Sequence, residues 1–342
     1  MNSPSQEDSN KGVPTRTLVN MKKLWISLII LLIIIVAASP VQALYETKTS
    51  IISKFKNLVA AHPSQASYVS IGKSVDGLDI PMFTFGNSST GGRILWDAQM
   101  HGGEDAGSET AYLFCEWLFA GDNSANNILA HNWILIIPVV NIDTADRPNS
   151  DNVNLNRNFP VGWGRSGSSD PKDRNGEYRG PYAGSEPETQ ALINVFKTYK
   201  PIFYVNTHMY GGPRIYYNSE IPSSIMDTLK SRLSLYGQIY GGDPAATNGW
   251  TRMSGGGYAM ATAESYGAYS FLWEIGGTST PPLSIVKDKY YKETRCFLIA
   301  AASMCADAAP PAVPEFQSLL ILPLFMMAAL LMVVLARKKR KD

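Results

Sequence analysis

Two side chains that bind metals well stand three residues apart just after an apolar, strand-like run. His101 and Glu104 follow this run, and a helix-like segment, 105–119, comes directly after them. A third donor, His208, follows another strand-like run, 202–207. Imidazole nitrogen and carboxylate oxygen are donors that zinc accepts, and a catalytic zinc takes three protein ligands and leaves one position open for water. The pattern therefore predicts a zinc site made by His101, Glu104 and His208.

A further carboxylate could supply the proton transfers of a hydrolysis. Glu274 ends the apolar run 269–273, where an acidic side chain is costly to bury without a purpose. Zinc lowers the pKa of a bound water to about 7. A nearby carboxylate can take that proton and pass it to the leaving amine. Glu274 is therefore the candidate general base.

The segment between the two histidines carries two arginines. Arg147 and Arg157 lie in residues 142–184, which are rich in Asn, Asp, Gly and Pro and show little periodicity. A long stretch of this kind in a compact domain is usually functional or disordered. An arginine fork binds a carboxylate through two parallel hydrogen bonds. With Asn156, the two arginines would form a receptor for a free peptide C-terminus, although for either one viewed alone a solvated loop arginine is the better interpretation.

The order of the predicted elements favours an α/β fold. Strand-like and helix-like runs alternate, and two near-continuous apolar runs, 94–100 and 133–140, suit strands that are covered on both faces. We predict a single domain over residues 44–307, with a mixed, mostly parallel twisted sheet flanked by helices on both faces. Ligands of such sheets bind beyond the carboxyl ends of strands. His101, His208 and Glu274 all stand at such ends.

Element boundaries follow from the same periodicities. A Ser-Glu-Pro-Glu sequence, 185–188, is interpreted as a capping box that opens a helix. The expected strands cover 68–71, 78–85, 94–100, 133–140, 202–207 and 269–273, and the expected helices cover 44–62, 105–119, 185–199 and 287–306.

As a set, these motifs resemble those of the zinc carboxypeptidase family, the carboxypeptidase A-like metallopeptidases. The resemblance covers roughly residues 44–306. It implies that His101, Glu104 and His208 bind one zinc ion per chain, and that Glu274 acts as general base and then as acid. The motifs that carry it, in the family's order, are His101-Gly-Gly-Glu104, Asn156-Arg-Asn-Phe159, Ser185-Glu-Pro-Glu188, His208-Met-Tyr210 and Glu274.

The resemblance also implies roles in substrate binding. Asn156 and Arg157 would hold the terminal carboxylate of a peptide. Arg147 would polarise the scissile carbonyl and stabilise the oxyanion. Tyr210 would line a substrate subsite. Peptide or protein C-termini are accordingly the expected partners.

Three positions depart from the family's pattern. Asn154 stands where the family usually has an aspartate that supports a zinc histidine, so the hydrogen-bond acceptor is kept but its charge is lost. The sequence Asn-Ile-Asp-Thr at 141–144 replaces an Asn-Pro-Asp-Gly turn, which places Arg147 less securely. The family's substrate-capping tyrosine has no counterpart at 250–253, and Tyr258 could take its role. No acid lies beside Tyr258, so no preference for basic C-terminal residues is expected.

Both ends of the chain carry export or membrane signals. A basic pair, an apolar run of 15 residues (24–38) and an Ala-x-Ala-like end describe a secretory signal region within 1–43, with Met21 as an alternative start. An uncleaved anchor is the other reading of that region. Near the other end, the apolar run 319–336 is long enough to span a bilayer, and the basic tail 337–342 predicts a cytoplasmic C-terminus.

The linker 308–318 contains Pro314-Glu-Phe316. With the apolar span and the basic end, this resembles an archaeal PEF-type sorting signal, which would make a membrane sorting protease a partner. An ordinary C-terminal membrane anchor is the alternative. Either reading places residues 44–307 on the extracellular side of the membrane or at the cell surface.

Charge and cysteine content narrow the class of protein. The whole chain carries a net charge of +1, and its two ends, 1–43 and 308–342, carry +2 and +3, which leaves about −4 for the middle. A mildly acidic domain has no nucleic-acid footprint. Three cysteines make no disulfide framework, although a Cys296–Cys305 bridge could form outside the cell.

Three hypotheses for the function follow. The first is a secreted, surface-tethered zinc metallocarboxypeptidase. The second is a zinc amidase that cleaves a cell-wall peptide bond or another non-standard amide. The third is an inactive peptide-binding module, which Asn154 and the missing tyrosine suggest.

Overall fold

The parts of the chain that surround the predicted zinc site are described by a computed structural model. It covers residues 45–89, 92–165, 177–212, 214–218, 220–242, 249–253, 258–277 and 280–305. The predicted signal region, sorting motif, transmembrane run and basic tail lie outside these residues. Within the described part of the chain, no helix combines the length and apolar character needed to cross a bilayer.

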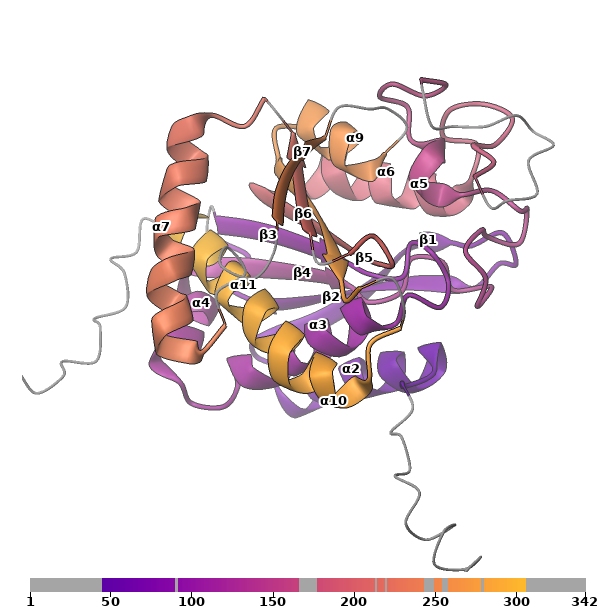
Figure 1. Ribbon diagram of the computed structural model, residues 1–342. Helices are drawn as coiled ribbons and strands as arrows, with labels where there is room; N and C mark the ends of the chain where they lie inside the picture. Colours follow the sequence, from indigo (N-terminus) through magenta and orange to yellow (C-terminus); the bar gives the residue numbers. More distant parts are fainter. Residues whose placement is uncertain are drawn as a thin grey trace, which may run out of the picture. The chain divides into compact units, whose positions relative to one another are not determined.

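Eight strands form one mixed sheet (Figure 1). The central strands run parallel to one another, in the order β4-β3-β5-β8, while β1 and β2 add antiparallel pairings at one edge. At the other edge, β6 pairs antiparallel with β8 and parallel with β7. The strands are β1 (Ala66–Lys73), β2 (Asp79–Gly86), β3 (Gly92–Asp97), β4 (Asn132–Ile137), β5 (Phe203–Met209), β6 (Arg214–Asn218), β7 (Gly249–Met253) and β8 (Tyr269–Ile275).

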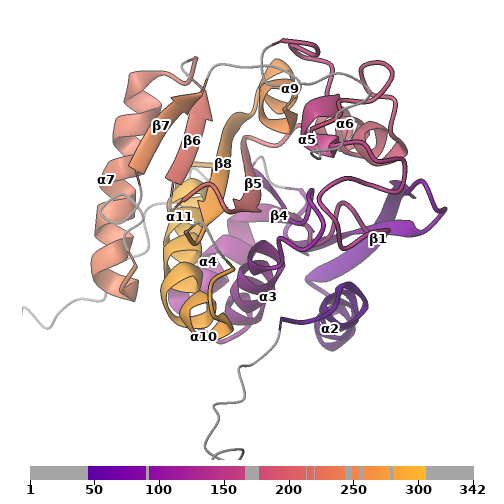
Figure 2. The same ribbon diagram turned by 45° about the vertical axis from the view of Figure 1, so that its right-hand side comes forward.

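Helices cover both faces of this sheet (Figures 1 and 2). One face packs against α2 (Lys48–Ala61), α3 (Ala106–Leu118), α4 (Asn123–His131), α7 (Ser223–Tyr240) and a helical run made of α10 (Leu283–Ile285), the π-helical turn η1 (Val286–Tyr290) and α11 (Tyr291–Cys305). The other face packs against α5 (Leu155–Asn158), α6 (Pro187–Tyr199) and α9 (Ala259–Ser265).

The alternation of side chains along the central strands explains the two layers. Along β3, Ile94 and Trp96 enter one apolar cluster, whereas Leu95 enters the other. Along β5, Val205 enters the first of these clusters and Tyr204 enters the second. Successive residues of a strand point to opposite faces, so a continuous apolar run supplies a core on each side. The predicted α/β fold with a mixed sheet is thereby confirmed.

No helices or strands are predicted from the sequence between β5 and β8, where the structure has β6, α7, β7 and α9. Helix α7 nevertheless carries a clear signal, because its buried residues Met226, Leu229, Leu233 and Tyr236 are spaced three or four apart. Helix α4 was also not predicted. The edge strand β7 and its neighbour β6 are short and half-exposed, so their sequences lack a strong period.

One local prediction is wrong, and one possibility that the sequence left open is excluded. The capping-box interpretation fails because the N-cap of α6 is Glu186, and no side chain caps the helix. Instead, the carboxylates of Glu186 and Glu188 accept hydrogen bonds from Nδ2 of Asn149, at 2.6 and 3.2 Å, and so tie the long loop to α6. The Cys296–Cys305 bridge is excluded, since nine residues of α11 separate the two by about 13 Å of helical rise, beyond the reach of a disulfide.

Candidate active site

The loop between β3 and α3 carries two of the predicted ligands, and its glycines let it pack closely. A Cβ atom on Gly102 would lie 2.4 Å from the carbonyl oxygen of Thr144 and 2.2 Å from that of Asp146. Gly103 has a φ of +76°, in the left-handed region that favours glycine. The two glycines between His101 and Glu104 are therefore needed to bring the loop against the neighbouring turn.

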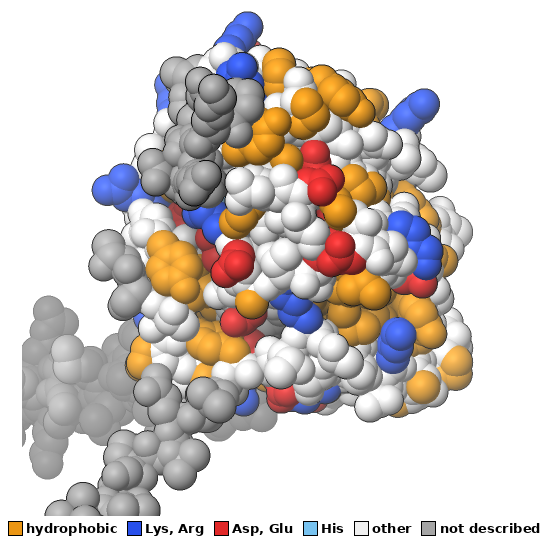
Figure 3. Space-filling model, turned by 90° about the vertical axis from the view of Figure 1, so that its right-hand side faces the viewer, with side chains coloured by type: hydrophobic (Ala, Val, Ile, Leu, Met, Phe, Trp, Pro, Cys, Tyr) orange, Lys and Arg blue, Asp and Glu red, His pale blue; other side chains and the backbone are white. Residues whose placement is uncertain are grey.

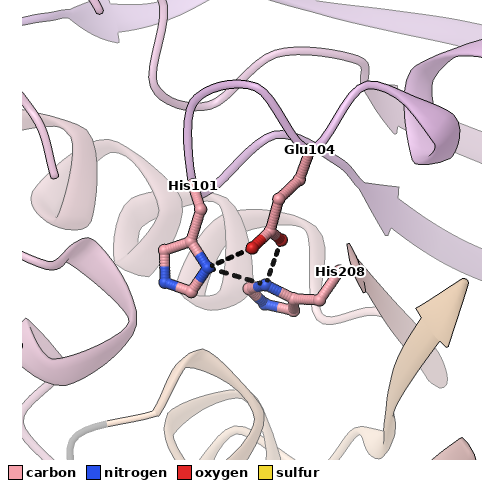
Figure 4. Close-up of side chains that lie close together, drawn as sticks. All are labelled: His101, Glu104 and His208. Carbon is pink, nitrogen blue, oxygen red and sulfur yellow. Dashed lines mark hydrogen bonds and ion pairs between the residues drawn. The ribbon is translucent and has the colours of Figure 1, made fainter. Parts of the chain in front are cut away.

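The three predicted ligands converge in a buried group (Figure 4). The carboxylate of Glu104 lies 3.0 Å from Nδ1 of His101 through Oε1 and 2.9 Å from Nδ1 of His208 through Oε2. The two Nδ1 atoms are 3.1 Å apart. Donors about 2.1 Å from a tetrahedral zinc would lie about 3.4 Å from one another, so the observed spacing is close to what zinc requires.

The second nitrogen of each ring indicates which atom is available to a metal. Nε2 of His101 lies 2.9 Å from Oδ1 of Asn154, and Nε2 of His208 lies 2.6 Å from Oδ1 of Asn206. An amide oxygen only accepts hydrogen bonds, so these contacts favour the proton of each neutral ring on Nε2; for His208 the Oδ1 of Asn206 at 2.6 Å is closer than the competing donor, Nδ2 of Asn156, at 3.2 Å. The lone pairs on Nδ1 then face each other and the carboxylate. Three electron-rich donors gathered in this way fit a zinc ion.

A chain of buried polar groups continues behind His208. Asn206 donates from Nδ2 to Oδ1 of Asp97 at 2.6 Å, and the hydroxyl of Tyr204 donates to Oδ2 of Asp97 at 2.7 Å. Burial raises the pKa of Asp97 to about 6, although the two hydrogen bonds oppose this change. The sequence analysis did not single out Asp97 or Asn206, because nothing in their types or spacing links them to His208.

Burial and charge set the ionisation of the three ligands. Burial lowers the pKa of His101 to about 4, so its ring is neutral. Burial acts to raise the pKa of Glu104, but the two histidines outweigh it and hold that pKa well below its usual range. For His208, burial acts to lower the pKa, and the carboxylate of Glu104 more than offsets it. Glu104 is therefore an anionic donor between two imidazoles.

Glu274 stands beside His208 on the neighbouring strand. The two residues are paired in the parallel register of β5 and β8. The backbone N–H of Gly211 donates to Oε2 of Glu274 at 3.0 Å, and a Cβ on Gly211 would lie 2.4 Å from Cδ of Glu274. Burial raises the pKa of Glu274, against the opposing effect of His208. The sequence analysis missed Gly211, whose role depends on the turn after β5.

A cavity of about 240 Å³ opens at these residues. Eight of the nine site residues predicted from the sequence line it, namely His101, Glu104, Arg147, Asn156, Arg157, His208, Tyr258 and Glu274. Tyr210 lies apart from this lining, since its side chain is exposed and its hydroxyl is 2.9 Å from Oγ1 of Thr280. Apolar walls that the sequence analysis did not identify complete the cavity, formed by Met209, Tyr216, Met253 and Leu272.

The turn that carries Arg147 is well anchored although it lacks the family's proline and glycine. The side-chain amide of Asn141 donates to the carbonyl oxygens of Asp146 and Pro148, at 3.4 and 3.0 Å. The ammonium of Lys48 donates to the carbonyl oxygens of Asn141 and Thr144. These bonds replace the missing turn residues and direct Arg147 into the cavity, where its Nη1 is 3.6 Å from Oε1 of Glu104.

The remaining polar residues of the cavity are fixed by their neighbours. Oδ1 of Asn156 accepts a hydrogen bond from the backbone N–H of Ala259 at 3.1 Å. The guanidinium of Arg157 lies 4.8 Å from the ring centroid of Tyr258. It also forms an ion pair with Glu177, a residue that the sequence analysis did not single out. On the described part of the face in Figure 3, acidic and basic side chains are interspersed.

Comparison with known proteins identifies relatives of this chain. The family model for zinc carboxypeptidases matches residues 51–291. Carboxypeptidase A6 of Homo sapiens is 28% identical over 273 residues, which cover 68% of this chain and 60% of the relative. Mast cell carboxypeptidase A of Rattus norvegicus is 27% identical over 220 residues, which cover 55% of this chain and 52% of the relative. The chain thus spans little more than half the length of these relatives.

Solved structures agree on the fold. Bovine thrombin-activatable fibrinolysis inhibitor, in complex with a tick carboxypeptidase inhibitor, has a TM-score of 0.65 at 19% identity, covering 77% of this chain and 97% of that one. Carboxypeptidase A of Helicoverpa armigera has a TM-score of 0.62 at 18% identity, covering 82% and 81%. At these identities the likeness concerns the architecture of the sheet and helices.

Proposed function

The chain belongs to the zinc carboxypeptidase family, and from this membership we propose that it is a zinc metallocarboxypeptidase that removes residues from the C-termini of peptides or proteins. One observation carries the proposal. A single cavity brings together the three ligands, the carboxylate of Glu274 and the guanidinium groups of Arg147 and Arg157. A hydrolytic centre and a receptor for a free carboxylate are therefore next to each other.

His101, Glu104 and His208 would hold the zinc, which when bound acts as a Lewis acid and lowers the pKa of a coordinated water. Glu274 accepts the proton of the attacking water and later gives it to the leaving amine. Burial raises its pKa, which makes the carboxylate a better proton acceptor. The N–H of Gly211 holds Oε2, which fixes the direction of the carboxylate.

The two arginines have separate tasks in this proposal. Arg147, whose guanidinium approaches Glu104 at the zinc site, stabilises the negative charge that develops on the scissile carbonyl oxygen. Arg157, which lines the same cavity, binds the terminal carboxylate, with Asn156 beside it. A peptide held in this way presents its last amide bond to Glu274.

The walls of the cavity favour an apolar side chain at the substrate's C-terminus. Met209, Tyr216, Met253 and Leu272 offer an apolar surface, and the lining residues that the structure describes contain no carboxylate besides Glu104 and Glu274. A buried lysine or arginine side chain would lack a partner there, which is costly. We therefore propose a preference for apolar over basic C-terminal residues.

A mixed peptide library tests this function. The zinc-loaded protein is incubated with free and C-terminally amidated peptides, and products are followed by mass spectrometry. Stepwise loss of C-terminal residues from the free peptides alone is expected. Internal cuts only would contradict the proposal, and cleavage confined to non-standard amides such as muropeptides would favour the amidase hypothesis. Tight binding without cleavage would favour the binding module.

We also propose that the enzyme is exported and tethered at the outer cell surface. The support comes from the sequence of residues 1–43 and 308–342, which resemble an export signal and a membrane or sorting tail. Protease treatment of intact cells, followed by detection of the catalytic domain, tests this placement. Degradation of the domain is expected, and protection from protease in intact but not in lysed cells would contradict it.

A further inference from the structure

Arg157, which binds the terminal carboxylate in the proposed function, and its neighbour Arg147 are both paired with one carboxylate of the chain itself. Oε1 of Glu177 lies 3.1 Å from Nη2 of Arg147, and Oε2 lies 2.7 Å from Nη2 of Arg157. One carboxylate thus bridges the two guanidinium groups. A substrate's terminal carboxylate is the same chemical group, and it would bind the same guanidinium group of Arg157.

The burial of the three side chains indicates which of them can be exchanged. Arg157 is 13% exposed and is held by the ring of Tyr258 and by a hydrogen bond from its Nη1 to the carbonyl oxygen of Asn156. Glu177 is 29% exposed, and Arg147 is 38% exposed. Ion pairs between partly exposed groups are weak and exchange readily with water. An incoming carboxylate can therefore displace Glu177 while Arg157 stays in place.

We propose that Glu177 is a specificity-determining residue of the carboxylate clamp, and that a substrate's C-terminal carboxylate binds by replacing it. This inference rests on the proposed function. Glu177 neutralises one of the two positive charges of Arg147 and Arg157, so it weakens the attraction for small acids in general. A peptide can still displace Glu177, because it makes additional contacts with the apolar walls of the cavity. A C-terminal amide, being neutral, does not displace Glu177.

A scaffold role for Glu177 predicts the opposite effect on the binding of a carboxylate. Glu177 could act as a scaffold that holds Arg147 and Arg157 in position for the substrate. Removal of its charge would then disorganise the clamp and weaken carboxylate binding. Replacement by the substrate predicts that the same change strengthens binding. The sign of the effect therefore separates the two roles.

Calorimetric titration of the zinc-loaded full chain with N-acetyl-L-phenylalanine and with its amide makes the test. We expect Glu177→Gln and Glu177→Ala to bind the acid about three- to tenfold more tightly than the wild type, because the acid no longer has to displace the weak, partly exposed ion pairs of Glu177. Binding of the amide should stay unchanged. Asp288→Asn, which removes a carboxylate that pairs with Lys292 at 2.6 Å on the exposed surface, is the matched control and should behave as the wild type.

Unchanged or weaker binding of the acid by both Glu177 variants would overturn the inference, as would tighter binding of the amide to the same degree. Equal zinc content and melting temperature in all variants show that the fold is retained. The measurement needs no turnover. If the protein cleaves no peptide but the Glu177 variants bind the acid more tightly, the proposed function fails and the inference about Glu177 stands. If the protein cleaves peptides but the variants bind the acid no more tightly, the proposed function stands and the inference fails.

Discussion

His208 and Glu274 occupy directly paired positions on the neighbouring parallel strands β5 and β8. Paired residues of adjacent strands lie on the same face of a sheet. The register therefore sets a metal ligand and the proposed base side by side, independently of any loop. Their backbone positions are as rigid as the centre of the sheet, which is what a catalytic pair requires.

Gly211 is predicted to be needed for the position of Glu274. A methyl group at residue 211 would lie 2.4 Å from Cδ of Glu274 and force the carboxylate to move. Gly211→Ala should lower kcat by about tenfold or more, because small misplacements of a catalytic group are costly. Gly277→Ala is the control, since a Cβ there would meet nothing within 4 Å. Equal kcat values for the two variants, with both folded, would refute this role.

Arg157 is predicted to recognise the free carboxylate of the substrate. Arg157→Ala should raise KM for free-carboxylate peptides by about 10–100-fold, as expected for loss of a hydrogen bond between charged groups. The inhibition constant of an amidated peptide, measured as a competitive inhibitor, should be affected far less. Arg252→Ala, at an exposed position on β7, serves as the control. If the KM of free peptides and the inhibition constant of amidated peptides rise equally, the clamp assignment fails.

Asn154 is predicted to limit the affinity for zinc. Its Oδ1 accepts the Nε2–H of His101 at 2.9 Å without contributing a charge. Asn154→Asp should keep that bond and the cap of α5, and add the charge that strengthens imidazole as a ligand. We expect zinc to bind about tenfold more tightly, since groups behind a ligand change affinity by about 10–100-fold. Competition with a chromophoric chelator measures this, and unchanged affinity would count against it.

Glu264 is predicted to make the stability of the fold depend on pH. Burial raises its pKa from 4.5 to about 7, although a hydrogen bond from Asn218 opposes the change. The native state thus keeps a proton that the unfolded chain loses, so stability falls as pH rises from 4.5 to about 7. Glu264→Gln should escape this loss.

The expected gain for Glu264→Gln at pH 8 is about 1 kcal/mol, a value reduced because the group is partly exposed. At pH 5 the variant and the wild type should differ much less. Denaturant unfolding at both pH values, with excess zinc, makes the comparison. An equal difference at pH 5 and pH 8 would show that the ionisation of Glu264 is not the cause.

The ligands were predictable from the sequence because each follows a local signal. His101, Glu104 and His208 come at or just after apolar strands, and the carboxyl ends of parallel strands meet at one edge of the sheet. Arg147 was also predicted as a site residue, but its position depends on a turn that lacks the family's Asn-Pro-Asp-Gly sequence. The contacts of Lys48 and Asn141 with that turn supply the reason.

The groups around the ligands were not predictable in the same way. Asp97 reaches His208 only through Asn206, and this link requires the register of β3 with β5. Glu177 meets Arg147 and Arg157 only after the long loop has folded back on itself. Such contacts join residues that are distant in the sequence and show no periodicity. They follow from the tertiary structure.

The most direct test of the account is to compare the turnover and zinc content of wild-type protein and Glu274→Gln. The variant keeps the three ligands and the shape of the side chain, and it removes the proton acceptor paired with His208. We predict one zinc ion per chain in both proteins, and a loss of kcat of about 100–10,000-fold in the variant. A variant that retains its zinc and turns over peptides within a factor of about ten of the wild type would contradict the assignment of Glu274 as the base.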